Sequence, residues 1–184
     1  MSKVIFLDVD GVLNRHHSLY GTKETSPMGF TGVGQKHLLE LRRIVDATSA
    51  KIILTSDWKD CFTTDDCDLK KANADGEYLV KRLKDVGLRI VERTNDQPLE
   101  CDRGKGFGGR GYGIRKYLKQ HPDVTEYVIL DDIEFRDFTG ELLDHFVYLE
   151  YPLTKRSADR AIKILLQGEK ETMKRKQKRK CRTT

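Results

Sequence analysis

The first fourteen residues, Met1–Asn14, read MSKVIFLDVDGVLN and decide the fold of this 184-residue chain. Val4–Leu7 is a short apolar run rich in β-branched and aromatic residues, which is typical of a strand buried on both faces. The run ends in two carboxylates, Asp8 and Asp10, which point the same way from an extended backbone because they are two positions apart. Gly11 then allows the chain to turn and a ligand to approach the backbone closely.

Two converging carboxylates repel each other unless a cation or a proton relieves them. Such a pair either binds a hard metal such as Mg²⁺ or divides its members between nucleophile and acid–base catalyst. An acidic turn without function is the simpler interpretation of an isolated Asp-x-Asp, and a metal-binding pair of this kind also occurs in sugar-nucleotide transferases. The motif therefore needs partners elsewhere in the chain.

Two further apolar runs supply those partners. Lys51–Ser56 ends in two hydroxyl residues, and Tyr127–Asp132 ends in two more carboxylates. In an open parallel sheet the ligand crevice lies beyond the carboxyl ends of the strands. Three such strands would therefore bring Asp-x-Asp, Thr-Ser and Asp-Asp into one crevice.

This combination resembles the haloacid dehalogenase (HAD) superfamily of phosphohydrolases, with DxDGVLN as its first motif, the hydroxyl of LTS as its second and ILDD as its fourth. The TSDW after the second strand, the RGYGIRKYLKQHP before the fourth and the late helix that contains Leu-Thr resemble one branch of it. That branch is the HAD-like domain of bacterial and phage RNA-repair proteins, akin to the phosphatase half of polynucleotide kinase-phosphatases. The resemblance covers roughly residues 1–167.

The resemblance implies roles for the acidic residues. Asp8 would be the nucleophile that forms an aspartyl-phosphate, and Asp10 would protonate the leaving oxygen and then activate water. A carboxylate attacks a phosphate dianion poorly because like charges repel, so Mg²⁺ bridging both is required. Its ligands would be Asp8, Asp10 through its backbone carbonyl, and Asp131 or Asp132, between which the motif does not choose.

The remaining motif residues are hydrogen-bond donors and cations. Thr55 is expected to donate to a phosphoryl oxygen, with Ser56 as its rival for that role and helix capping as the alternative. The third motif of the superfamily is a Lys or Arg that neutralises charge at the site. We assign Arg110, at the start of the helix before the fourth strand; Lys105, also a candidate substrate contact, and Lys116 are the alternatives.

Several other features have two interpretations. Trp58 is a candidate for stacking on a base or sugar of the substrate, but an anchor for the following helix in the core is the favoured interpretation. His16 and His17 could contact substrate from a flap. The glycines of Gly106–Gly111 match GxGxxG, but no strand runs into them, so a dinucleotide site is not expected; a GxxxxGK[ST] phosphate loop is absent.

Periodicity and turn signals complete the predicted fold. They indicate helices over Gln35–Ala47, Gly76–Val86, Arg110–Gln120 and Ser157–Gln167, with further strands near Leu88–Arg93 and at His145–Leu149. The alternation implies an α/β fold, a Rossmann-like three-layer α/β/α parallel sheet of about five strands. The two places where the superfamily inserts cap domains, Asn14–Gly34 and Thr94–Gly109, are short, so a capless fold or one with a minimal flap is expected. An open site of this kind admits a polymer end, whereas enzymes for small metabolites more often need a lid.

The net charge of +5 is a property of the C-terminal end. Residues 169–184 hold eight Lys or Arg against two Glu, which is +6 and leaves −1 for the remainder. We therefore expect a HAD-like domain over 1–167 and a basic tail or helix extension over 168–184 that attracts phosphate backbones non-specifically.

Composition also bounds the location and the metal chemistry. No apolar stretch is long enough to cross a bilayer and no signal peptide is visible, so a cytoplasmic protein without membrane contact is expected. Four cysteines without CxxC spacing indicate reduced thiols. A zinc site that includes Cys61, Cys67 and Cys101 is a minor alternative to Mg²⁺.

The sequence thus predicts an Mg²⁺-dependent hydrolase that removes a terminal phosphate from a polynucleotide or nucleotide. A small-molecule 5′- or 3′-nucleotidase is the first alternative. A non-catalytic module that binds nucleic acid or protein on a HAD scaffold is the second. Neither the polarity of the phosphate nor the oligomeric state follows from the sequence.

Overall fold

The computed structural model of the chain describes residues 2–15, 25–29, 31–64, 67, 71–97 and 109–167. Its strands are β1 (Ser2–Leu7), β2 (Lys51–Leu54), β3 (Ile90–Arg93), β4 (Val124–Asp131) and β5 (Phe146–Tyr148). Its helices are α1 (Gln35–Thr48), α2 (Ala74–Asp85), α3 (Arg110–Gln120), α4 (Glu141–Asp144) and α5 (Lys155–Leu165), with a 3₁₀ helix η1 (Asp57–Cys61).

The five strands form one parallel sheet in the order β3-β2-β1-β4-β5. From β1, at the centre, the chain moves outward through β2 to β3 and then returns to β4 on the other side of β1. This reversal separates the loops that leave β1 and β4, and ligands bind at such switch points beyond the carboxyl ends of the strands.

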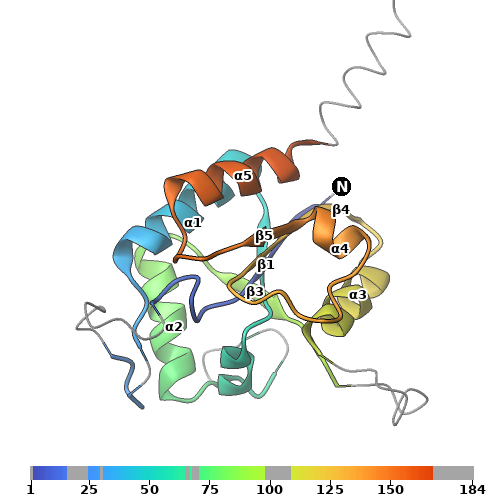
Figure 1. Ribbon diagram of the computed structural model, residues 1–184. Helices are drawn as coiled ribbons and strands as arrows, with labels where there is room; N and C mark the ends of the chain where they lie inside the picture. Colours follow the sequence, from blue (N-terminus) through green and yellow to red (C-terminus); the bar gives the residue numbers. More distant parts are fainter. Residues whose placement is uncertain are drawn as a thin grey trace, which may run out of the picture.

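Helices cover both faces of the sheet (Figure 1). The helices α1, α2 and α5 pack on one face around alternate β1 residues such as Ile5 and Leu7. On the other face, residues of α3 and α4 pack around Val4 and Phe6. Because helices cover both faces of the central strands, the sequences of these strands are continuous apolar runs. The helices on both faces of the sheet confirm the predicted three-layer α/β/α fold.

Local sequence sets the bounds of the two helices that pack side by side across one face (Figure 1). Helix α1 buries Leu38, Leu41 and Ile44, which recur at helical spacing, and it ends at Ser49 in the left-handed conformation with φ 57°. Helix α5 begins after Thr154, where a capping box with Ser157 satisfies the first backbone donors. The predicted start at Ser157 is two residues too late, because the capping box precedes the apolar positions on which the prediction depended.

The predicted elements are all present, with shifts at their ends. Helix α3 has the predicted bounds, whereas β4 begins three residues before the predicted Tyr127. Two short helices were missed, η1 and α4, since neither is long enough to show a periodic apolar face. The first of them starts because the Ser56 hydroxyl accepts a hydrogen bond from Trp58 N.

The described part of the segment between β1 and α1 forms a small flap, which we define as residues 25–34 without Phe30. An antiparallel bridge joins Thr25 to Thr31. Helix α2 holds the flap, because the Asp75 carboxylate accepts from Met28 N at 3.1 Å and the Tyr78 hydroxyl from Val33 N at 3.1 Å. This matches the expected minimal flap.

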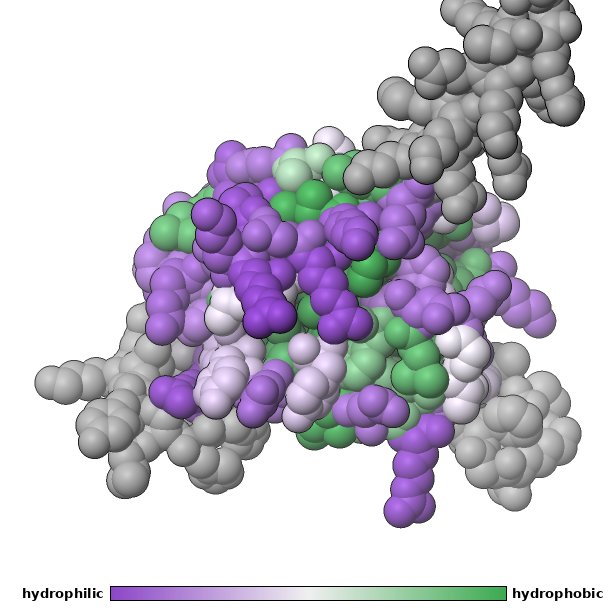
Figure 2. All heavy atoms as spheres, turned by 45° about the horizontal axis from the view of Figure 1, so that its top comes forward, coloured by the Kyte–Doolittle hydropathy of each residue, from purple (hydrophilic) through white to green (hydrophobic). Residues whose placement is uncertain are grey.

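The face of the molecule drawn in Figure 2 is mostly hydrophilic. Figure 2 shows hydrophobic side chains in several separate areas between long hydrophilic ones. Among the helices that the structure describes, none combines the length and the apolar character needed to span a membrane.

The two leucines of α1 provide a stability test. Leu41 is fully buried, whereas Leu39 is 53% exposed. We expect Leu41→Ala to lower the free energy of unfolding by about 2–5 kcal/mol, because it leaves a cavity between α1 and the sheet. Leu39→Ala should change it by less than about 0.5 kcal/mol. Urea unfolding of both variants measures the difference, and equal losses would contradict the orientation of α1.

Candidate active site

The predicted acidic residues meet at the carboxyl ends of β1 and β4. Asp8 follows β1, and its backbone N–H donates to Leu130 O at 3.0 Å, which continues the pairing of the two strands. Asp131 ends β4 and is fully buried, while Asp132 follows it. Each of these three residues offers a carboxylate oxygen within 4.8 Å of the other two. In the described part of the chain this is the one cluster of acidic, His or Cys side chains with such geometry.

Arg110 lies in the middle of this negative charge. Its Nη1 donates to Asp131 Oδ2 at 2.6 Å and forms an ion pair with Asp8 Oδ1 at 2.8 Å. Its Nη2 lies 3.5 Å from Asp57 Oδ1, and its guanidinium carbon lies 4.6 Å from the centre of the Phe135 ring. The structure therefore brings the predicted charge-neutralising residue to the cluster. Its first position in α3 follows from Gly109, which takes φ 120°, a value that other residues rarely adopt.

Burial of this charge changes the protonation of the carboxyl groups. Burial raises the pKa of Asp8 to about 7; Asp131 and Asp132 act in the same direction, while Arg110 and a hydrogen bond from Ser56 oppose them. The pKa of Asp131 is also raised, again chiefly by burial. For Arg110, burial disfavours the charge, but the two neighbouring carboxylates outweigh it and raise the pKa. The guanidinium is thus permanently charged.

The cluster has the chemistry of a divalent-cation site. Three carboxylates opposite one guanidinium leave two uncompensated negative charges when all are ionised. All the donor atoms are oxygens, which Mg²⁺ prefers. Asp8, Asp131 and Asp132 therefore fit an Mg²⁺ ion, and both members of the Asp-Asp pair belong to the set. The cysteines of the zinc alternative are not in this cluster, and Cys101 lies outside the described residues.

Asp10 has a different environment from Asp8. Its Oδ1 accepts from Asn14 Nδ2 at 2.7 Å, and its Oδ2 accepts from the indole N–H of Trp58 at 2.9 Å. Its carboxylate is not part of the three-residue cluster, so the predicted metal contact of Asp10 falls to its backbone carbonyl. Two fixed donors hold this carboxylate in one orientation, as a group that transfers protons requires.

Trp58 acts on the site from within the core. Its side chain is only 5% exposed. Stacking on a substrate base needs an open ring face, and the buried ring of Trp58 does not present one. The favoured alternative, an anchor in the core, describes its packing, and the hydrogen bond to Asp10 adds a positioning role that the sequence did not reveal.

The two hydroxyl residues after β2 divide the predicted roles. Thr55 Oγ1 is buried and has no hydrogen-bond partner among the residues that the structure describes. Ser56 caps η1 and bonds to Asp8. A buried hydroxyl without a partner costs free energy unless a ligand completes it. The Thr55 hydroxyl is thus available to a ligand, and Ser56 is the residue that caps η1.

Gly11 approaches a carboxylate. It takes φ +72°, and a Cβ atom built there would lie 1.9 Å from Asp132 Oδ2. Glycine is therefore required both for the turn and for Asp132 to reach the cluster. The sequence predicted that a ligand approaches the backbone at Gly11, whereas in the structure the Asp132 carboxylate lies there.

Among the alternatives for the charge-neutralising residue, the described Lys116 is not brought to the cluster. Lys116 donates to Gln97 O at 3.3 Å and is not among the contacts of Asp8 or Asp131. Lys105, His16 and His17 lie outside the described residues. The sequence analysis gave no role to Asn14, although it closes the first motif, and Phe135 carries no signal in the sequence.

Comparison with known proteins gives one family match. A family model described as "HAD domain in Swiss Army Knife RNA repair proteins" matches residues 4–158. No curated protein matches the chain. The matched range contains every residue of the site described above.

The raised pKa of Asp8 predicts how stability depends on pH and Mg²⁺. Asp8 has a pKa of about 7 in the folded protein and of about 3.9 when unfolded. Between these values the folded state keeps a proton that the unfolded chain has released, so metal-free protein should lose stability as pH rises through this window. Because Mg²⁺ replaces that proton, its effect on Tm should be small at about pH 5 and large at about pH 8.

Thermal unfolding with Mg²⁺ or EDTA over this pH range measures the effect. Asp8→Asn should reduce the pH dependence of the metal-free protein, whereas the exposed Asp46→Asn should not. An Mg²⁺ shift that is the same at both ends of the range would contradict the assignment.

Gly11 and Gly140 form a matched pair for testing the close approach. Both take positive φ, 72° and 59°, but a Cβ at Gly140 would meet nothing within 4 Å. Both Ala variants should lose about 1–3 kcal/mol of stability through backbone strain, and Gly11→Ala should lose more because its Cβ would collide with Asp132. Only Gly11→Ala should weaken Mg²⁺ binding in titration calorimetry, since it alone displaces Asp132. Equal affinities in the two variants would contradict the role of Gly11.

Proposed function

Since the chain belongs to the family of HAD domains in Swiss Army Knife RNA repair proteins, we propose that it is an Mg²⁺-dependent hydrolase that removes a terminal phosphate from a polynucleotide or nucleotide. The family supports a phosphatase-type activity in general. The observation that carries the proposal is the arrangement of the buried Asp8, Arg110 and Asp131 with the partly exposed Asp132 at the switch point of the sheet.

In the first step Asp8 attacks phosphorus. A bond forms between a carboxylate oxygen of Asp8 and phosphorus, while the bond from phosphorus to the leaving oxygen breaks. Asp10, held by Trp58 and Asn14, gives its proton to that leaving oxygen. Arg110 and the hydroxyl of Thr55 stabilise the charge on the transferred phosphoryl group.

The second step restores the enzyme. Asp10, now ionised, takes a proton from water, and the oxygen of that water attacks the phosphorus of the aspartyl-phosphate. Phosphate leaves and Asp8 is again a carboxylate. The two carboxylates can divide these roles because their environments differ: Asp8 faces a guanidinium and two acids, and Asp10 accepts from neutral donors.

Mg²⁺ would be held by the side chains of Asp8, Asp131 and Asp132, with the backbone carbonyl of Asp10 as a further ligand. When bound, it supplies the positive charge that allows a carboxylate to approach a phosphate dianion.

A nucleic-acid end is the proposed substrate class. The insertion between β1 and α1 forms a small flap in its described part rather than a cap, which favours an open site. The basic residues of 168–184, outside the described part of the chain, would add a non-specific attraction for phosphate backbones that weakens with salt. A cytoplasmic location fits this substrate class and is likewise a proposal.

Phosphate release in Mg²⁺ tests the proposal. The substrates are 3′- and 5′-phosphorylated oligonucleotides, the corresponding mononucleotides and a generic aryl phosphate. We expect one oligonucleotide end to be preferred and Asp8→Asn to lower the rate by at least about a thousandfold, because the nucleophile is lost. The exposed Asp46→Asn is the control and should retain the rate.

The other outcomes favour other functions. Equal or faster release from mononucleotides would indicate a nucleotidase. No release from any substrate would favour a binding module on a HAD scaffold. Full activity in folded Asp8→Asn would rule out the aspartyl-phosphate route.

A further inference from the structure

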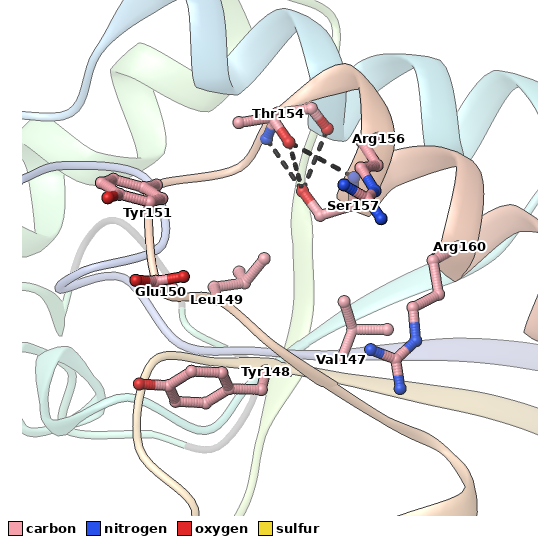
Figure 3. Close-up of a pocket in the computed structure, with 9 residues that line it drawn as sticks. All are labelled: Val147, Tyr148, Leu149, Glu150, Tyr151, Thr154, Arg156, Ser157 and Arg160. Atoms are coloured by element: carbon pink, nitrogen blue, oxygen red, sulfur yellow. Dashed lines mark hydrogen bonds between the residues drawn. The ribbon is translucent and has the colours of Figure 1, made fainter.

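A pocket of about 370 Å³ lies beside the candidate active site, between the end of β5 and the start of α5 (Figure 3). Its lining comes from the loop that joins these elements and from the first turns of the helix: Val147, Tyr148, Leu149, Glu150, Tyr151, Thr154, Arg156, Ser157 and Arg160. None of these residues has a role in the chemistry proposed above.

Backbone hydrogen bonds connect the pocket to the metal-ligand loops. Tyr148 pairs in register with Asp131 on the adjacent strand, which places their backbones about 4.8 Å apart. Leu149 N donates to Asp131 O at 2.9 Å, and Leu153 N donates to Val12 O at 2.8 Å. The pocket therefore begins at the strand end next to Asp131.

One wall of the pocket is aromatic. Tyr148 is 53% exposed and Tyr151 is 57% exposed. Figure 3 shows both rings on the side of the pocket away from the arginines, with Glu150 between them, and the Tyr148 ring packs edge-on against Phe146 at 6.2 Å. Ile133, after β4, and Met28, on the flap, are exposed too. Four of the six large hydrophobic side chains that are exposed in the described residues thus follow strands of this edge or lie on its flap. A nucleic-acid base has a flat apolar face that can stack on an aromatic ring.

The opposite wall is basic. Arg156 and Arg160 lie one turn apart on α5, and Figure 3 shows both across the pocket from the tyrosines. Arg160 Nη2 donates to Phe146 O at 3.2 Å, which fixes its guanidinium beside the edge strand. With Glu150 the pocket carries a net charge of +1, from two cations and one anion. A guanidinium can bind a phosphate, and a carboxylate can accept from a base amino group or a ribose hydroxyl.

We propose that this pocket is a nucleotide subsite, which binds the base and backbone of a single-stranded nucleic acid next to the terminal phosphate held at Asp8. Stacking on Tyr148 or Tyr151 needs a base that is free of its neighbours, so a single strand fits and a duplex does not. The subsite rests on the proposed function, because it gives that function its substrate class.

Kinetics on two substrates separate the subsite from the chemistry. We expect Tyr148→Ala/Tyr151→Ala to lower kcat/KM for a terminally phosphorylated trinucleotide by at least about tenfold, because base stacking is lost. The same variant should change kcat/KM for a generic aryl phosphate by less than about twofold, because that substrate does not reach the pocket. The matched Tyr148→Phe/Tyr151→Phe variant keeps the rings and should behave as the unchanged protein.

The arginine wall has its own matched pair. Arg156→Gln should lower kcat/KM for the trinucleotide, whereas Lys163→Gln, which removes an exposed cation from the same helix, should not.

Equal losses on both substrates in the double Ala variant, or no loss on either, would overturn the subsite while the phosphatase function stands.

Binding decides the case in which no substrate is hydrolysed. The proposed function would then fail, and fluorescence anisotropy of a dye-labelled trinucleotide phosphate would test the subsite directly. The double Ala variant should bind the trinucleotide more weakly than the unchanged protein. If this difference persists at high salt, it supports the subsite, because salt does not screen base stacking. Unchanged binding would overturn it.

Discussion

The arrangement of this protein depends on one guanidinium buried among carboxylates. Arg110 is in contact with Asp8 and Asp131. Together with Asp132, these carboxylates carry more negative charge when ionised than one guanidinium can compensate. Placing so much negative charge out of water is unfavourable unless cations or protons compensate it. The raised pKa of Asp8 expresses that imbalance. A site that binds a divalent cation and then a phosphate dianion needs this imbalance, because a balanced ion pair would attract neither.

The fold supplies this arrangement through few positions. The reversal between β1 and β4 brings the loops after both strands together, and Gly11 allows Asp132 to approach where any side chain would collide. A second set of contacts, from Trp58 and Asn14, holds the Asp10 carboxylate apart from the cluster of Asp8, Asp131 and Asp132. Two aspartates in one short motif thereby obtain different environments. In the proposed mechanism this difference assigns the role of nucleophile to Asp8 and the proton transfers to Asp10.

Much of this was predictable from the sequence, and the limits have physical causes. The strands that end in Asp8, Thr55 and Asp131 are buried on both faces, so their apolar runs and polar ends are visible as patterns. Arg110 could be chosen because it starts a periodic helix, but its contact with both acids is a tertiary fact. The bond from Trp58 to Asp10 spans 48 positions, and no local pattern encodes it. The helices η1 and α4 are too short to show a periodic apolar face, so the sequence does not predict them.

The central claim is that Asp8 becomes phosphorylated during turnover. Acid quenching of the enzyme with Mg²⁺ and a phosphorylated substrate, followed by borohydride reduction and peptide mass spectrometry, tests it most directly. Reduction converts an aspartyl-phosphate to homoserine. The account predicts homoserine at position 8 and an unmodified Asp10. Homoserine at another aspartate instead of position 8 would contradict the assignment of the nucleophile.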